Sequence, residues 1–233
     1  MVPKPILPDG PKFGTPFAFG FSRSSNEYKV VKIVTTSKFW SNVEVYTLGM
    51  DCWRVLESIS YGIAAFRSVT ALVNGVIHWY GCEAEGDVII AFDVKDEIFQ
   101  EISRPRGVDY NSCDVEIWEL GGLLSMICIF GQIEVREIQM WVMKEYGVAE
   151  SWTKGFKIER PDVLGQFSFL QPLGVTKDGE IIIKKDNSKV VLYNPNTGTC
   201  REPREFGFRF YDAYPYIGSL VSPKSFSGRS EET

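Results

Sequence analysis

The amino-acid sequence predicts an all-β protein, a kelch-like β-propeller made of four-stranded antiparallel blades. The first observation is the abundance of aromatic residues, 16 Phe, 10 Tyr and 6 Trp in 233 residues, which favours strands over helices. The second is a repeated strand hairpin, whose equivalent aromatic residues Tyr46, Phe92, Trp141 and Tyr193 lie 46, 49 and 52 residues apart. A period near 50 residues is typical of β units that stack or surround an axis.

The clearest copy of this hairpin is residues 140–158, two apolar arms that carry Trp141 and Trp152 around a turn with Gly147. Weaker copies occupy residues 43–56, 88–102 and 189–203. A single four-stranded sheet cannot hide both of its faces, so neighbouring units must pack on each other. A β-sandwich also uses many short strands but needs no constant period, so the propeller is the better interpretation.

Each unit is expected to be a meander of four strands joined by turn-forming residues, the strongest of which is the hairpin signal Asn74-Gly75. The strands expected in the first two units are residues 17–21, 28–34, 43–48 and 52–56, then 71–73, 76–80, 88–94 and 97–102. The strands expected in the last two units are residues 115–120, 123–130, 138–143 and 151–158, then 169–176, 180–184, 189–193 and 199–201.

The two ends of the chain differ from the repeats. We expect residues 1–12 to form an irregular lead rich in Pro and Gly, residues 13–221 to form the propeller domain, and residues 222–233 to form a flexible polar tail. Within the domain, residues 213–221 read as one further strand without partners. We therefore expect four blades, one unpaired terminal strand and an incomplete ring, in a chain that is the carboxy-terminal portion of a longer protein or a divergent short form.

The connections predict where the molecule binds a ligand. Those between successive units are long (residues 57–68, 103–114, 159–168 and 204–212), and those between the second and third strands (35–42, 81–87 and 131–137) are longer than a tight turn needs. Both sets lie at one end of a meander, and scaffolds place recognition on such loops. The alternative is that the long loops are tolerated insertions. The candidate binding residues on this loop end are Phe39, Trp40, Tyr61, Phe66, Arg104, Arg106 and Tyr110.

Phe39 and Trp40 stand between polar residues, so they are either an exposed binding anchor or a loop that folds back onto the core. Other large rings are expected to pack between blades: Trp53, Phe99, Trp141 and Trp152.

Catalytic and metal sites are not indicated. The single histidine, His78, lies in an expected strand, and the five cysteines are scattered, as in a protein with reduced thiols. The acidic residues Asp93, Asp96 and Glu97 are expected to be solvated turn carboxylates. We therefore predict no cofactor, no metal and no catalytic residue.

The charge and hydropathy of the chain restrict its partners and its location. A net charge of −5 argues against nucleic acid or an anionic membrane as a partner. An apolar run of about 18 residues and a secretory signal are both absent from the sequence, which predicts a soluble cytoplasmic or nuclear protein.

The units resemble the F-box-associated domain of plant F-box proteins, of the kelch-like type found in the S-locus F-box group. The most specific match is WVMKEYG at residues 141–147, followed by ESWTK at 150–154. The other matching segments are residues 19–34, 43–56, 72–80, 88–102 and 172–198, so that the resemblance extends from about residue 13 to residue 221.

This resemblance implies a substrate-recognition subunit of an SCF-type E3 ubiquitin ligase. In such proteins an N-terminal F-box docks on a Skp1-like adaptor and through it on the cullin, while the propeller binds the protein to be ubiquitinated. The sequence lacks the F-box segment, so the expected partner of these residues is the target protein alone. The alternative function is a propeller enzyme that acts through a central channel, which would need convergent carboxylates, histidines or a metal.

Overall fold

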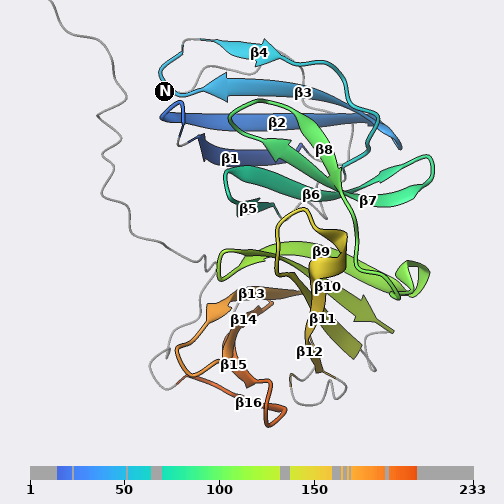
Figure 1. Cartoon of the computed structure of the whole chain (residues 1–233), viewed down its shortest axis with the longest axis vertical. Helices are drawn as coiled ribbons and strands as arrows, with labels where there is room; N and C mark the ends of the chain where they lie inside the picture. Colours follow the sequence, from blue (N-terminus) through green and yellow to red (C-terminus); the bar gives the residue numbers. More distant parts are fainter. Residues whose placement is uncertain are drawn as a thin grey trace, which may run out of the picture. The chain divides into compact units, whose positions relative to one another are not determined.

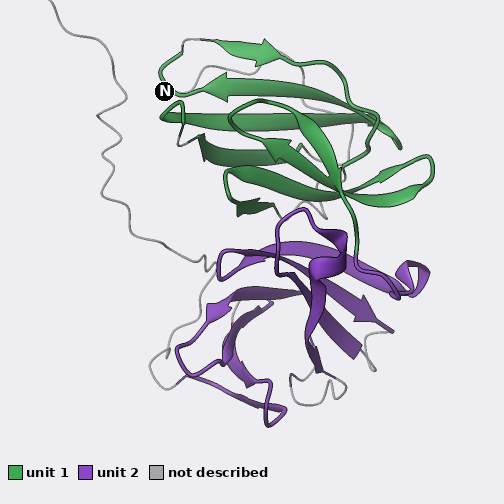
Figure 2. Ribbon diagram, in the orientation of Figure 1, with its two compact units in different colours: residues 1–104, 218–233 green, residues 105–217 purple. Residues whose placement is uncertain are grey.

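The computed structural model is all-β, as the sequence predicts, and its described residues form four antiparallel four-stranded sheets, or blades (Figure 1). The chain forms two compact units, residues 1–104 with 218–233 (unit 1) and residues 105–217 (unit 2) (Figure 2). Among the described residues there is no helix of the length and apolarity needed to cross a membrane. The described residues are 15–22, 24–50, 52–63, 70–131, 137–158, 164, 167, 169–186 and 189–203.

Unit 1 contains the first two blades, and in each one the strands pair in the order of the sequence. The first blade comprises β1 (Phe17–Ser22), β2 (Glu27–Ser37), β3 (Trp40–Thr47) and β4 (Trp53–Val55). The second blade comprises β5 (Ala71–Val73), β6 (Val76–Glu83), β7 (Gly86–Asp93) and β8 (Phe99–Ile102). The expected hairpin turn at Asn74-Gly75 joins β5 to β6, and both of its residues have positive φ.

The core of unit 1 is an apolar layer between its two blades. The alternation of side chains along each strand puts Val31, Ile33, Val43 and Val45 of the first blade in one cluster with Ile77, Trp79, Ile90 and Phe92 of the second. Gly20 lets the two blades approach closely, since a Cβ atom there would lie 2.6 Å from a methyl group of Val94. This layer is the main apolar contact that holds the two blades together.

On the first blade, Lys32 and Glu44 lie directly opposite each other on β2 and β3. By alternation they belong to the face opposite Val31 and Val43. The Lys32 Nζ lies 3.3 Å from the Glu44 carboxylate, and the two side chains are only 1% and 0% exposed. A buried ion pair of this kind compensates two charges that would each be very unfavourable alone.

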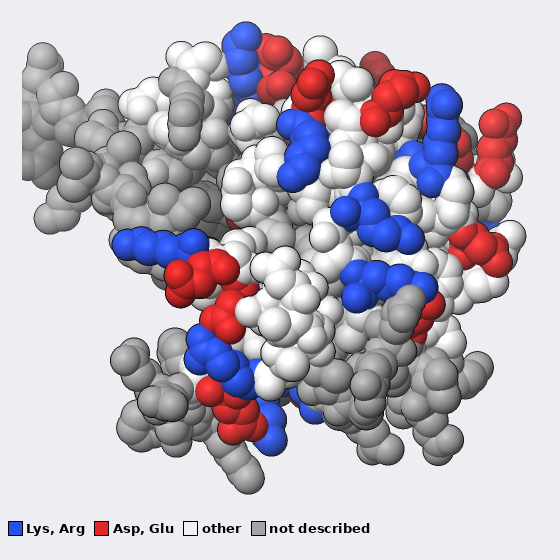
Figure 3. Space-filling model, turned by 60° about the horizontal axis from the view of Figure 1, so that its bottom comes forward, with Lys and Arg blue, Asp and Glu red and all other residues white. Residues whose placement is uncertain are grey.

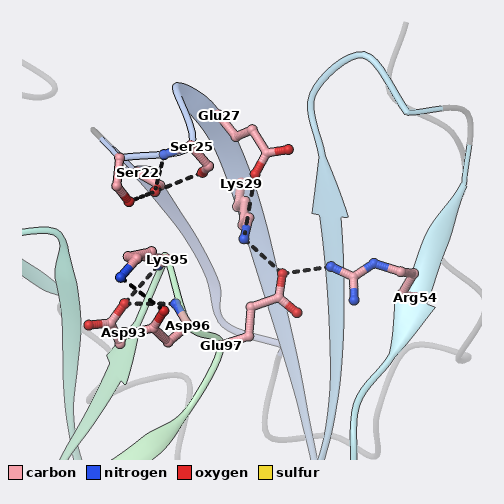
Figure 4. Close-up of polar contacts among 10 residues, drawn as sticks. Ser22, Ser25, Glu27, Lys29, Arg54, Asp93, Lys95, Asp96 and Glu97 are labelled. Atoms are coloured by element: carbon pink, nitrogen blue, oxygen red, sulfur yellow. Dashed lines mark hydrogen bonds and ion pairs between the residues drawn. The ribbon is translucent and has the colours of Figure 1, made fainter.

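A second ionic contact links the two blades of unit 1. Glu97 follows β7 and accepts hydrogen bonds from Lys29 Nζ on β2 (2.9 Å) and from Arg54 Nη2 on β4 (2.6 Å) (Figure 4). The Glu97 side chain is only 15% exposed, so the expectation of a solvated carboxylate is wrong for this residue. Asp96, by contrast, is 51% exposed, and Asp93 accepts hydrogen bonds from the backbone N–H groups of Lys95 and Asp96 within the turn.

Unit 2 contains the other two blades. The third comprises β9 (Cys113–Leu120), β10 (Leu123–Phe130), β11 (Glu137–Met143) and β12 (Trp152–Ile158), with the short 3-10 turns η2 (Tyr110–Ser112) and η3 (Ala149–Ser151) before β9 and β12. The fourth comprises β13 (Leu170–Val175), β14 (Ile181–Lys185), β15 (Lys189–Asn194) and β16 (Thr199–Arg201).

The blades of unit 2 meet through apolar side chains at their facing surfaces. The rings of Phe156 and Tyr193 lie 5.4 Å apart, and the Tyr193 hydroxyl donates to the Lys157 carbonyl. The apolar residues along this seam are Ile127, Ile138, Phe156 and Ile158 of the third blade and Leu170, Pro172 and Ile183 of the fourth.

All sixteen expected strands are present within a few residues of the predicted bounds. The expectation of long connections between second and third strands is wrong for the first two blades. The β2–β3 turn contains only Lys38 and Phe39, and the β6–β7 turn only Ala84 and Glu85. The extra residues extend the strands, because Thr35 and Ser41, or Cys82 and Asp87, can continue the ladder of hydrogen bonds. The predicted lead at 1–12, strand at 213–221 and tail at 222–233 lie outside the described residues.

Candidate functional site

The expected loop end of unit 1 contains a groove beside the β6–β7 hairpin. Its volume is about 240 Å³. The groove lies where the hairpin extends beyond β8, so its wall combines residues of the hairpin and of β8 with the first two residues of the connection 103–114. The lining residues are Glu83, Glu85, Gly86, Asp87, Val88, Glu101, Ile102, Ser103 and Arg104.

The lining of this groove is strongly acidic. Four carboxylates line it (Glu83, Glu85, Asp87 and Glu101), and Arg104 is the one basic residue among its lining. Partial burial, together with the negative charges of Glu101 and Glu85, raises the pKa of the Glu83 carboxyl. In the view of Figure 3, by comparison, acidic and basic side chains of the described residues are interspersed. The groove is thus a local concentration of negative charge.

Tyr61 supplies a hydroxyl beside the groove. Its hydroxyl donates a 2.7 Å hydrogen bond to Glu101 Oε1 on β8. Burial raises the pKa of Tyr61 to about 12, and the hydrogen bond and the negative charge of Glu101 act in the same direction. Tyr61 is therefore a neutral donor at physiological pH, and it holds one groove carboxylate in place.

Arg104 has a similar positioning contact with Tyr80 and Asp87. The Arg104 Nη1 donates to the Tyr80 hydroxyl at 3.3 Å, and that hydroxyl donates to Asp87 Oδ2, also at 3.3 Å. Burial raises the pKa of Tyr80 to about 12, although the nearby Arg104 acts to lower it. This chain of contacts joins β6, β7 and the residues after β8 at the same end of the second blade.

Phe39 and Trp40 lie at the tip of the β2–β3 hairpin. Phe39 is half-buried in the two-residue turn, with the Lys38 ammonium 4.9 Å from its ring centre. Trp40 begins β3 and is 52% exposed. The Lys38 carbonyl accepts a hydrogen bond of 3.0 Å from Cys82 Sγ, next to the groove residue Glu83. The exposed Trp40 therefore belongs to a hairpin tip that contacts the groove strand.

The structure brings together only part of the predicted site. Tyr61 and Arg104 lie at the groove, and Phe39 and Trp40 lie on the adjoining hairpin tip. Arg106 and Tyr110 belong to unit 2, and Phe66 lies outside the described residues.

The two residues of unit 2 have local partners there. Arg106 contacts Glu150 at 3.4 Å while both side chains remain largely exposed, and the Tyr110 hydroxyl donates to the Pro105 carbonyl. Neither residue lines the groove described above.

The groove carboxylates were not predicted as site residues from the sequence. Glu83, Glu85 and Asp87 alternate with small residues in CEAEGD, a pattern that indicates a hairpin tip with outward acidic side chains. Their meeting with Glu101 depends on the register between β7 and β8, in which Ile89 lies opposite Ile102. Sequence spacing alone does not give that register.

His78 has a structural environment. Its side chain is fully buried, its Nδ1 lies 3.1 Å from the Ala71 carbonyl, and burial lowers its pKa to about 4. Its imidazole is therefore neutral at physiological pH. Within the described part of the chain, no group of three or more His, Cys, Asp or Glu residues has a geometry that could hold a metal ion.

Comparison with known proteins identifies the family. Residues 3–212 match the F-box associated beta propeller domain. Among curated relatives from Arabidopsis thaliana, F-box protein CPR1 is 27% identical over 202 residues, covering 76% of this chain and 49% of the relative. F-box/kelch-repeat protein At3g23880 is 28% identical over 214 residues, covering 89% and 56%. The chain thus spans about half the length of these relatives.

Among solved structures, the acylaminoacyl peptidase of Pyrococcus horikoshii is 10% identical with a TM-score of 0.44, covering 81% of this chain and 32% of that one. A likeness this weak supports no conclusion about function. The family match covers about nine-tenths of the chain, so this chain belongs to the F-box associated beta propeller domain family.

Proposed function

We propose that this chain is the target-binding part of an F-box protein, which acts as substrate receptor in an SCF-type ubiquitin ligase. The observation that carries the proposal is the match of residues 3–212 to the F-box associated propeller family, supported by relatives that are named F-box proteins. The role proposed for these residues is to bind the target protein. Docking on the Skp1-like adaptor and the cullin is assigned to an F-box outside these residues.

We also propose that the target contacts the loop end of unit 1. Three features support this location: the acidic groove, the exposed Trp40 and the ordered contact between them through Lys38 and Cys82. An exposed Trp next to a concave polar surface is the kind of anchor that dominates the binding energy of protein interfaces. The proposed role of this surface is non-catalytic, and the proposal assigns ubiquitin transfer to other subunits of the ligase.

The test is a receptor made by joining an F-box to the amino end of this chain, expressed in plant cells. Protein half-lives across the proteome are compared with those in cells that express the F-box alone. The proposal predicts a small set of proteins whose half-lives shorten only with the joined receptor and only while the proteasome is active. If the receptor binds the adaptor and is ubiquitinated itself but shortens no other half-life, the proposal is wrong.

The site is tested in the same cells with Trp40→Ala and Ile98→Ala. Both residues are exposed and apolar in unit 1, at 52% and 61%, but Ile98 lies in the β7–β8 turn at the opposite end of β7 from the groove. With Trp40→Ala, the target half-lives are expected to return to the longer values seen with the F-box alone. With Ile98→Ala, they are expected to stay short. The reverse result would move the binding surface to the other end of the unit.

A further inference from the structure

A short segment after the first blade, residues 59–63, is hydrogen-bonded on both sides. On one side Ile59 exchanges backbone hydrogen bonds with Ser41 of β3, at 2.9 and 3.0 Å. On the other side Gly62 exchanges backbone hydrogen bonds with Cys82 of β6, at 2.8 and 2.9 Å. This segment, here named the strap, therefore joins the first blade to the second at the end of unit 1 that contains the groove.

Two hydroxyl groups of the first blade add to this attachment. Thr35 Oγ1 donates to the Ile63 carbonyl at 2.6 Å and accepts from the Ile63 N–H at 3.2 Å. Ser41 Oγ donates to the Tyr61 carbonyl at 2.8 Å, and the Ser41 side chain is fully buried. These bonds fix the backbone on both sides of Gly62, so residues 59–63 of the long connection 57–68 are held by hydrogen bonds to both blades.

Gly62 is the point of closest approach between the strap and the β2–β3 turn. A Cβ atom at this position would lie 2.7 Å from the Lys38 carbonyl carbon and closer still to the carbonyl oxygen. The same carbonyl accepts the hydrogen bond from Cys82 Sγ. Because the obstacle is backbone and not a flexible side chain, any larger residue at position 62 must push the strap and the hairpin tip apart.

The strap connects the two parts of the proposed target surface. At one end it contacts the hairpin tip that presents Phe39 and Trp40, and it contains Tyr61, whose hydroxyl holds the groove residue Glu101. Adhesion between the blades is already provided by the apolar core and by the Glu97 contacts. The polar contacts of the strap therefore contribute something more specific, a fixed distance between the aromatic tip and the groove.

We infer that Gly62 is a positioning residue for target recognition, which holds Trp40 and the acidic groove in one preformed surface. The inference rests on the proposed function. Preorganisation raises affinity because binding need not order the surface. A displaced strap is expected to weaken capture of the target even when both blades remain folded.

The experiment compares Gly62→Ala with the matched control Gly174→Ala. Gly174 lies on β13 in unit 2, and a Cβ atom there would meet nothing within 4 Å. Amide hydrogen exchange in the isolated chain and target half-lives in cells are measured for both variants. Gly62→Ala is expected to lower the exchange protection of the backbone amides of residues 62 and 82 at least tenfold. It is also expected to lengthen the target half-lives to the values seen with the F-box alone. Gly174→Ala is expected to change neither quantity.

If Gly62→Ala does not fold, the pair Thr35→Val and Thr35→Ser replaces it. The valine variant loses both hydrogen bonds to Ile63 and is expected to lengthen target half-lives, whereas the serine variant keeps the hydroxyl and is expected to behave as the unchanged protein. If Thr35 had a purely structural role, the valine and serine variants would differ in target half-life only when they also differ in melting temperature.

If Gly62→Ala loses amide protection but the target half-lives stay short, the inference is wrong and the proposed function still stands. Unchanged amide protection in Gly62→Ala would overturn it as well, with or without a target. A joined receptor that shortens no half-life at all would instead count against the proposed function.

Discussion

Tyr61 donates its hydroxyl hydrogen to Glu101, and the 2.7 Å bond joins the strap to β8 of the second blade. The contact spans two segments that are 40 residues apart in the sequence. It gives the loop end of unit 1 a defined polar geometry, on which the first prediction and the closing crosslinking test depend.

The first prediction concerns alkaline pH. Burial raises the pKa of both Tyr61 and Tyr80 to about 12, against an ordinary value of 10. Because the unfolded chain ionises first, the stability from these neutral hydroxyls is complete below pH 10 and is lost as the pH rises through 12. The free energy of unfolding in urea should therefore fall over this range. In Tyr61→Phe with Tyr80→Phe the fall should be shallower, and an equally steep fall would contradict the assignment.

The second prediction concerns His78, which can be followed without overlap because it is the only histidine. Burial lowers its pKa to about 4, below the unfolded value near 6.5. The folded state thus favours the neutral ring, so this contribution to stability is complete above pH 6.5 and is lost as the pH falls through 4. A shift of this size corresponds to roughly 3 kcal/mol. NMR titration of the ring should give a midpoint near 4, and a midpoint near 6.5 would show that the ring is solvated.

The third prediction concerns the contact between the blades at Glu97. Replacement by Gln keeps the shape of the side chain but removes the charge that faces Lys29, whose side chain is only 6% exposed. We expect Glu97→Gln to lower the free energy of unfolding by about 2 kcal/mol, since a mostly buried cation loses its main partner. Asp96→Asn, which affects an exposed pair with Lys95, should cost less than about 0.5 kcal/mol. Equal effects of the two variants would mean that the Glu97 contact does not stabilise unit 1.

The Glu97 contact also has a pH dependence. Burial acts to raise the pKa of Glu97, but the hydrogen bonds from Arg54 and Lys29 outweigh it and the pKa lies below its usual value. Its stabilisation is therefore complete above the unfolded pKa near 4.5 and is lost as the pH falls through the lower folded value. Glu97→Gln should remove this part of the acid sensitivity.

The fourth prediction concerns the buried pair Lys32–Glu44. Glu44→Gln leaves the Lys32 ammonium without the carboxylate charge 3.3 Å away, and a loss of about 3 kcal/mol is expected in urea unfolding. The double variant Lys32→Met with Glu44→Leu replaces both charges by apolar groups of similar size and should recover most of that loss. A double variant less stable than Glu44→Gln would show that the pair contributes favourably on its own.

Most of the fold could be predicted from the sequence because its signals are local. Hairpin turns such as Asn74-Gly75 and short, mostly apolar runs such as 28–34 and 123–130 indicate strands wherever they occur. The connections were predicted less well, because Thr35 and Ser41 resemble loop residues in composition but pair across the β2–β3 ladder. A polar residue does not end a strand whose neighbour offers a hydrogen-bond partner.

The candidate site depends on contacts that the sequence does not encode locally. Tyr61 and Arg104 were proposed from loop position alone, and their partners Glu101 and Tyr80 become visible only in the folded blade. Glu97 appeared to be a turn carboxylate because Lys29 and Arg54 are 68 and 43 residues away in the chain. Gly62 gave no turn signal, since its role is a close backbone approach and not a positive φ.

The most direct test of the central claim is to place a photo-crosslinking amino acid at position 40, 61 or 98 of the F-box-joined receptor. After irradiation in cells, the attached proteins are identified by mass spectrometry and compared with those whose half-lives the receptor shortens. We predict that positions 40 and 61 both capture the same short-lived protein and that position 98 does not. Capture of that protein at position 98, with none at 40 or 61, would contradict the assignment of the target surface to the loop end of unit 1.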